Sequence, residues 1–142
     1  MLKTLVAICL TIGISMASYP LPSSAEDIIT DKPSQELLYH DIVISMLLPQ
    51  IQKQIDEFYL TLLTETPSVY PYMVYVINSK RLGDFRSFKF TVTFKVIPVV
   101  GPHISVGSDI FTFTINSSKV EMTKFDHLKT EELPPHWQHI VR

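Results

Sequence analysis

The chain has 142 residues, a formal net charge of −2 and a single cysteine. This length suits one domain, and the lack of a positive net charge argues against a nucleic-acid partner. The single cysteine, Cys9, lies in the first 25 residues, which we expect to be removed. The mature chain would then have no cysteine, no disulfide and no thiolate metal site, so the fold must rely on its hydrophobic core. A domain without disulfides that is nevertheless exported is more typical of bacteria than of animals.

Residues 1–25 have the layout of a secretory signal peptide: a short start containing Lys3, an uncharged apolar run over 5–16, and small residues before Ala25. The apolar run is short for a membrane span, which needs about 20 residues. We expect cleavage after Ala25, with Ala17 as the alternative site, and a secreted or cell-surface protein. If the segment is retained, the chain is a membrane-tethered accessory protein.

Four segments follow from the composition of the chain. We expect residues 1–25 to be the signal peptide and 26–33 a flexible leader. Residues 34–128 then form a single domain. Residues 129–142, which contain two adjacent prolines, are expected to be a tail that docks loosely or stays mobile.

Residues 35–63 give the strongest helix signal in the chain. Ser34 is a suitable N-cap, and the threonine-rich stretch before Pro67 is expected to end the helix. Pro49 removes a backbone donor and clashes with the preceding turn, so we expect a sharp kink, or two helices broken near this residue. The apolar side chains form one stripe with the period of an α-helix; its members are Leu37, Ile44, Leu48, Ile51, Ile55, Phe58 and Leu62.

Four strands are predicted after the helix, over residues 72–79, 87–96, 106–116 and 120–128. The second alternates strictly, which indicates one buried and one wet face and therefore an antiparallel sheet. Its expected inward residues are Phe88, Phe90, Val92, Phe94 and Val96, and those of the third strand are Phe111, Phe113 and Ile115.

The first and fourth strands are predicted to differ from these two. The first, 72–79, is apolar on both faces, so it is either covered on both sides or part of an interface, for example in a homodimer. The fourth, 120–128, alternates weakly, which suits an edge strand. The predicted fold class is α+β, with a kinked N-terminal helix on a four-stranded antiparallel meander. Its element order is similar to cystatin-like and cone-shaped folds.

Three polar residues are candidates for binding. His40 and Asp41 lie next to the apolar stripe, where a buried carboxylate would have a shifted pKa, the usual mark of a working acid or base. The alternative is an exposed carboxylate near a helix N-terminus. His127, preceded by Asp126, resembles two-thirds of a catalytic triad, but no serine lies in a Gly-x-Ser-x-Gly turn. We therefore expect no catalytic residue.

The five histidines do not form a metal-binding motif. His136 and His139 are the only close pair, in a proline-led segment where no helix would place them on one face. Zinc needs three or four converging ligands, and that set is incomplete here. We expect no metal and no cofactor.

The stretch LYHDIVISMLLPQIQKQIDEFY resembles a known family. The features that carry the resemblance are Asp41, the Leu47-Leu48-Pro49 step, the spacing of Ile51 and Ile55, the ending Phe58-Tyr59, and a later strand ending Phe125-Asp126-His127. The family consists of small exported proteins of spore-forming Gram-positive bacteria and is catalogued as a domain of unknown function. The resemblance covers about residues 34–128; it implies export and supplies no activity.

The functional prediction is an exported, non-enzymatic binding or interaction protein. Its partner would be an unknown protein or a component of the cell envelope, with His40, Asp41 and His127 as candidate binding residues. The alternative is a small-ligand carrier or degenerate enzyme with a pocket between helix and sheet and Asp41 at its rim. Contact with a membrane is expected only through the signal segment.

Overall fold

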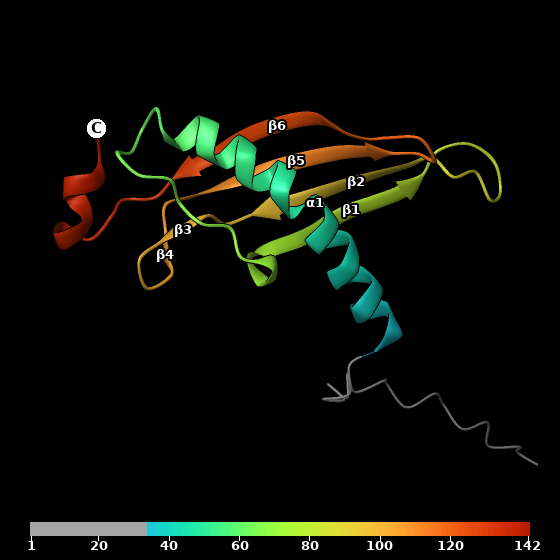
Figure 1. Ribbon diagram of the computed structural model, residues 1–142, viewed down its shortest axis with the longest axis horizontal. Coiled ribbons are helices and arrows are strands. Elements are labelled where there is room, and N and C mark those ends of the chain that lie inside the picture. The colour runs from blue at the N-terminus through green and yellow to red at the C-terminus, as the bar shows by residue number, and fades with distance from the viewer. Residues whose placement is uncertain (1–33) are drawn as a thin grey trace, which may run out of the picture. The chain divides into compact units, whose positions relative to one another are not determined.

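The computed structural model describes residues 34–142, and the predicted signal peptide and leader lie outside the described residues. One long helix is followed by a four-stranded antiparallel sheet (Figure 1), so the predicted α+β fold is confirmed. The elements are α1 (Gln35–Tyr59), η1 (Pro71–Met73), β1 (Val74–Arg81), β2 (Phe90–Val96), β3 (Val99–Val100), β4 (Ile104–Ser105), β5 (Gly107–Ile115), β6 (Val120–Thr130) and η2 (Pro135–Ile140).

Helix α1 begins at the predicted cap, where the Ser34 hydroxyl accepts the Leu37 N–H at 3.0 Å. It continues through Pro49 as one element, so the alternative of two separate helices is wrong. Figure 1 shows that its axis bends about half-way along. Pro49 lies on the exposed side of the helix. Solvent can therefore satisfy the carbonyl that loses its partner, and the helix tolerates the proline.

The helix ends at Tyr59, four residues before the predicted end at 63. The N–H groups of Leu62 and Leu63 both donate to the Tyr59 carbonyl, at 2.9 and 2.7 Å. This tight turn replaces another helical turn and brings Leu63 into the core at 5% exposure. No helix within residues 34–142 is long and apolar enough to cross a membrane.

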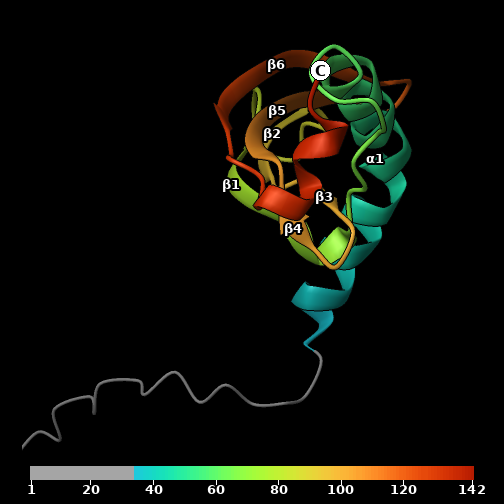
Figure 2. The ribbon, with the colours of Figure 1, turned by 90° about the vertical axis from the view of Figure 1, so that its left-hand side faces the viewer.

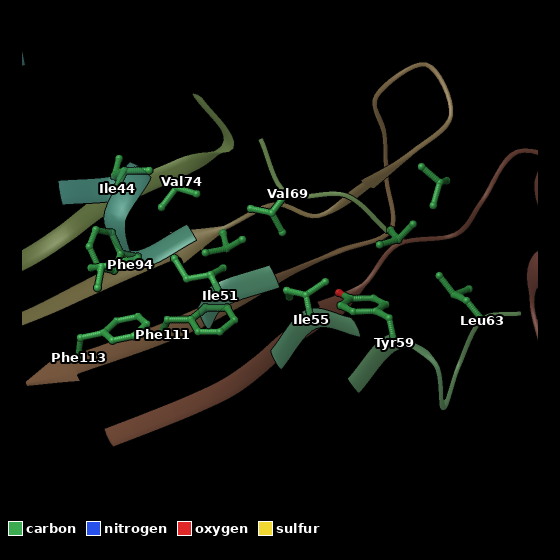
Figure 3. Packing of buried hydrophobic residues seen from close by; sticks show 14 of the residues in the cluster. Ile44, Ile51, Ile55, Tyr59, Leu63, Val69, Val74, Phe94, Phe111 and Phe113 are labelled. Atoms are coloured by element: carbon green, nitrogen blue, oxygen red, sulfur yellow. The ribbon is translucent and has the colours of Figure 1, made fainter. Parts of the chain in front are cut away.

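The sheet has the order β1-β2-β5-β6, and every neighbouring pair is antiparallel. The fourth predicted strand is therefore an edge, as expected. Helix α1 covers one face of the curved sheet (Figure 2). Ile51 and Ile55 of α1 are fully buried, as are Phe94, Phe111 and Phe113 of the central strands (Figure 3). Burial of each such side chain stabilises the fold by roughly 1.5–3 kcal/mol.

One expectation for the strands is wrong, and for the first strand one of the two alternatives, coverage on both sides, is excluded while the interface alternative stays a prediction. Strand β2 begins at Phe90, so Phe88 lies in the preceding connection and is 63% exposed instead of pointing inward. In β1 only Val74 is buried, and Tyr75 and Ile77 are exposed at the free edge of the sheet. The two apolar faces of this strand are therefore not covered within the described chain.

A short hairpin, β3–β4, lies between β2 and β5. Its turn contains Gly101, with φ of 49°. A Cβ at this position would clash with the Trp137 indole, so the turn and the C-terminal segment are in direct contact. The close approach explains why glycine is needed here.

The C-terminal residues are packed against the domain, in contrast to the loose tail that we expected. Strand β6 continues to Thr130, and Leu133 and Ile140 are buried at 5% and 2% exposure. The Thr64 N–H donates to the Ile140 carbonyl at 2.7 Å. This segment therefore closes the end of the core next to the C-terminus of α1.

Candidate functional site

His40 and Asp41 lie on the first half of α1 and face solvent. Their side chains contact each other at 3.3 Å, and the Asp41 side chain is 63% exposed. Asp41 is thus not a buried acid, and the alternative of an exposed carboxylate near the helix N-terminus is the observed one.

His127 lies near the other end of α1, where its ring is 4.6 Å from the ring of Phe58. Phe58 and Asp41 are 17 positions apart on the helix, which corresponds to about 25 Å. The three candidate residues therefore do not form one site. His127 lies instead beside Phe58 and Asp109.

The partner of His127 is Asp109 of β5, not its neighbour Asp126. His127 Nδ1 and Asp109 Oδ1 share a hydrogen bond of 2.7 Å. The Asp109 side chain has no exposed surface, and 22% of the His127 side chain is accessible. Asp126 instead pairs with Lys124 at 2.6 Å. The sequence paired His127 with Asp126, whereas in the structure His127 is hydrogen-bonded to Asp109.

Two further hydroxyl groups complete this cluster. The Tyr59 hydroxyl donates to Asp109 Oδ2 at 3.0 Å, and His127 Nε2 is hydrogen-bonded to the Thr130 hydroxyl at 2.8 Å. We refer to Tyr59, Asp109, His127 and Thr130 as the Asp109 cluster. Both carboxylate oxygens and both imidazole nitrogens have partners, so the cluster is a continuous chain from the core to the surface.

Burial controls the electrostatics of the cluster. Desolvation raises the pKa of Asp109, while hydrogen bonds from His127 and Tyr59 oppose the increase. Desolvation also raises the pKa of Tyr59, and the neighbouring Asp109 raises it further. Tyr59 therefore keeps its proton and donates it to the Asp109 carboxyl group.

A β-bulge in strand β6 gives His127 its contact with Thr130. Asp109 pairs with His127, whereas Ser108 pairs with Lys129, so Leu128 is an extra residue on the β6 side. In a regular strand residues three apart point to opposite faces. The extra residue places the Thr130 side chain on the same face as His127, and bulges commonly change the direction of a side chain in this way.

Gly107 leaves the space that the Tyr59 hydroxyl occupies. A Cβ at this position would clash with that hydroxyl and with the Lys129 carbonyl. A glycine at the start of β5 therefore allows a buried tyrosine to reach a buried aspartate.

A pocket of about 330 Å³ adjoins the cluster, between the end of α1, β6 and the C-terminal segment. Its apolar wall includes Leu62, Val106 and Leu133, while Thr130 and Gln138 provide hydrogen-bonding groups. Glu131, Glu132 and Arg142 add charges of both signs. Pockets for small ligands have this size and this mixture of apolar lining with a few polar groups.

Chemically, the site can hold a small molecule and present a hydroxyl oriented by a histidine and a buried carboxylate. Within residues 34–142, no three His, Cys, Asp or Glu side chains are placed to hold a metal ion. His136 and His139 lie in η2, and each of their rings is about 6 Å from the ring of Trp137, at 6.2 and 6.0 Å.

The fold and the site define a small α+β domain with a helix on one face of an antiparallel sheet and a polar cluster beside a pocket. A family model with the description "Protein of unknown function (DUF3888)" matches residues 39–129, and the chain belongs to this family. No curated protein and no solved structure matches it. The resemblance to a family of unknown function is thereby confirmed.

Sequence reasoning missed Asp109, although a signal was present. Phe111 and Phe113 were placed on the inward face of their strand, and the period of two puts Asp109 on that same face. A carboxylate in an inward position requires partners, and Tyr59 at the end of α1 and His127 of β6 are those partners.

Proposed function

We propose that this chain is an exported binding protein without enzymatic activity, and that its ligand site is the 330 Å³ pocket. The observation that carries the proposal is the polar wall of this pocket, where the Thr130 hydroxyl is held by His127 and, through it, by the buried Asp109. A preorganised polar group in an apolar pocket fixes the orientation of a ligand at little entropic cost.

The chemistry of the lining indicates the class of ligand. Leu62, Val106 and Leu133 suit a small apolar body, and Thr130 and Gln138 suit a hydrogen-bonding end group. The sequence predicted a pocket between helix and sheet with Asp41 at its rim. The observed pocket lies elsewhere: Asp41 is in solvent and far from this end of α1.

The proposal is tested with the environment-sensitive dye N-phenyl-1-naphthylamine, excited outside the tryptophan band. Leu62 is half-buried in the pocket wall, so Leu62→Trp should fill the cavity and weaken dye binding at least about tenfold. The matched control is Leu60→Trp, since Leu60 is 43% exposed and does not line the pocket. Equal binding by both variants would show that the dye binds elsewhere and would contradict the proposal.

One observation favours a second candidate function, the hydrolysis of an ester. Thr130, His127 and Asp109 are connected in the order of a nucleophile, a base and an orienting carboxylate. The Thr130 oxygen would form a bond to the ester carbonyl carbon while His127 Nε2 takes the hydroxyl proton. The bond from that carbon to the alcohol oxygen would then break as His127 returns the proton to the alcohol. Water, deprotonated by His127, would hydrolyse the acyl-threonine to a carboxylic acid and restore the hydroxyl. Release of p-nitrophenol from p-nitrophenyl butyrate, lost in Thr130→Val, would replace the binding proposal with this one.

Export is the second part of the proposal. Its support is the signal-peptide layout of residues 1–25 and the resemblance to a family of exported proteins of spore-forming Gram-positive bacteria. We expect the protein recovered outside the producing cell to begin at Glu26, which N-terminal sequencing would check. A chain that starts at Met1 and stays with the membrane fraction would support the membrane-tethered alternative.

A further inference from the structure

The connection between β1 and β2 presents two of the most exposed apolar side chains of the described chain. Phe85 is 94% exposed and Phe88 is 63% exposed. Scattered surface leucines need no explanation, but an almost fully exposed phenylalanine beside a second one indicates contact with an apolar environment. We refer to residues 80–89, which are the last two residues of β1 and the connection to β2, as the basic-aromatic loop.

The same ten residues carry a concentration of positive charge. They contain Lys80, Arg81, Arg86 and Lys89 against the single acid Asp84, in a chain whose net charge is −2. Within residues 34–142, none of these four basic side chains forms an ion pair, whereas Lys53, Lys119, Lys124 and Lys129 all do. The loop is therefore a local cationic surface on an otherwise acidic molecule.

The backbone of the loop is held in place before any partner arrives. The Leu82 N–H donates to the Lys89 carbonyl at 2.7 Å, and the Ser87 N–H donates to the Asp84 carbonyl at 2.9 Å. The Arg81 guanidinium bonds to the Ser87 carbonyl and lies 4.7 Å from the centre of the Phe90 ring. Docking of a folded loop requires little ordering, which favours binding.

The loop lies at one end of the sheet. Arg81 is paired with Phe90, Phe90 with Ile115, and Ile115 with Val120, so the β1–β2 and β5–β6 connections share this end (Figure 1). Val43 of α1 lines the same surface hollow as Arg81 and Phe90. Val43 also lines a second hollow together with Met46, which is 70% exposed.

We propose that the basic-aromatic loop docks this protein on the surface of an anionic lipid bilayer. Phe85 and Phe88 enter the interfacial region, while Lys80, Arg86 and Lys89 lie among the anionic headgroups. Apolar insertion and electrostatic attraction act together at such a surface, and basic side chains extend to the headgroups while their stems cover apolar area. Sequence analysis alone assigned membrane contact only to residues 1–25.

A single-stranded nucleic acid is the competing partner for a basic and aromatic surface. Such partners stack successive bases on aromatic side chains along a groove. Phe85 is instead at the tip of a connection and exposed on almost all sides, which suits insertion better than stacking. The overall negative charge of the chain also opposes a long polyanion more than a contact at one tip.

The test is co-sedimentation of the protein, purified in its processed form, with vesicles. We expect binding to vesicles of equal parts phosphatidylglycerol and phosphatidylcholine, and little binding to phosphatidylcholine alone. The double variant Phe85→Ala/Phe88→Ala and the double variant Arg86→Glu/Lys89→Glu should each bind at least about tenfold more weakly. All four positions are exposed, so circular dichroism and the midpoint of thermal unfolding should stay unchanged.

Matched controls separate the loop from general surface effects. Leu128→Ala removes an apolar side chain that is 57% exposed on β6, and Lys53→Glu/Lys129→Glu reverses two exposed charges elsewhere; neither should weaken vesicle binding appreciably.

Equal binding by wild type and Phe85→Ala/Phe88→Ala, or no preference for the anionic vesicles, would overturn the proposal. Tighter binding to oligothymidylate than to vesicles would assign the loop to nucleic acid instead. Dye binding in the pocket should not change in the loop variants, so the two proposals fail separately.

Discussion

At the scale of single residues, the candidate site depends on one buried carboxylate. Asp109 has no exposed surface and uses both oxygens, one toward Tyr59 and one toward His127. Removal of one partner of such a group leaves a buried acceptor without a donor, which is more costly than the bond itself is worth. Loss of any one of these three side chains is therefore expected to destabilise the hydrogen bonds of the other two.

The pH dependence of stability should report on Asp109. Because burial raises the folded-state pKa above the ordinary value of 3.8, the folded protein binds this proton more readily than the unfolded chain does. The stabilisation is fully present below pH 3.8 and is lost as pH rises through the raised pKa. We expect the unfolding free energy of the wild type, relative to Asp109→Asn, to fall as pH increases from about 4.

Urea titrations at a series of pH values would measure this difference. Asp126→Asn is the matched control, because Asp126 is on the same strand and pairs with Lys124 rather than with the cluster. A difference between wild type and Asp109→Asn that does not change with pH would show that Asp109 has the same proton affinity in both states.

At the scale of elements, helix α1 contains a conflict between local and tertiary preferences. Pro49 costs its helix about 3 kcal/mol relative to alanine in an undistorted interior position, yet Ile44 and Leu47 before it and Ile51 and Ile55 after it are all buried. Packing on the sheet outweighs the local cost, which is why the helix bends and does not break.

We expect Pro49→Ala to raise the free energy of unfolding by roughly 1–3 kcal/mol. The substitution restores a backbone donor on the exposed side and leaves the buried stripe unchanged. Urea denaturation would measure the gain, and Gln50→Ala, at the adjacent exposed position, should change stability by less than about 0.5 kcal/mol. A loss of stability in Pro49→Ala would mean that the proline-induced bend is needed to seat Ile44 and Leu47.

At the scale of the whole molecule, the C-terminal segment closes the core that the helix and sheet begin. Ile140 is 2% exposed, and the Arg142 N–H donates to the Leu62 carbonyl at 2.9 Å. The same segment forms one wall of the pocket. Stability and the proposed ligand site therefore both depend on residues that the sequence alone left outside the domain.

Ile140→Ala should destabilise the protein by about 2–5 kcal/mol, the usual cost of deleting a buried aliphatic side chain. The adjacent Val141 is 46% exposed, so Val141→Ala should cost much less, within about 1 kcal/mol. Chemical denaturation of both variants would test this. Equal and small effects would indicate that the C-terminal segment contributes little to the cooperative unit.

The sequence by itself determined the helix with its N-cap, the four antiparallel strands, and the inward positions of Phe94, Phe111 and Phe113. The predicted helix stripe was right in part: Ile44, Ile51 and Ile55 are buried, but Leu37 is 50% exposed. These features depend on periodicities of 3.6 and 2 residues, which are local and can be seen along the chain. The exposed position of Phe88 was not predictable in this way, because alternation continues past the point where pairing stops.

Only the tertiary structure decided which carboxylate meets His127, where the pocket lies and how the C-terminus packs. Asp109 and His127 are 18 positions apart, Tyr59 and Asp109 are 50 apart, and Thr64 and Ile140 are 76 apart. Their contacts depend on strand order, on a one-residue bulge in β6 and on the absence of a side chain at Gly107. Such contacts follow from the packing of distant elements. The local period of two places Asp109 on the inward face of its strand, but it does not say which side chains Asp109 meets there.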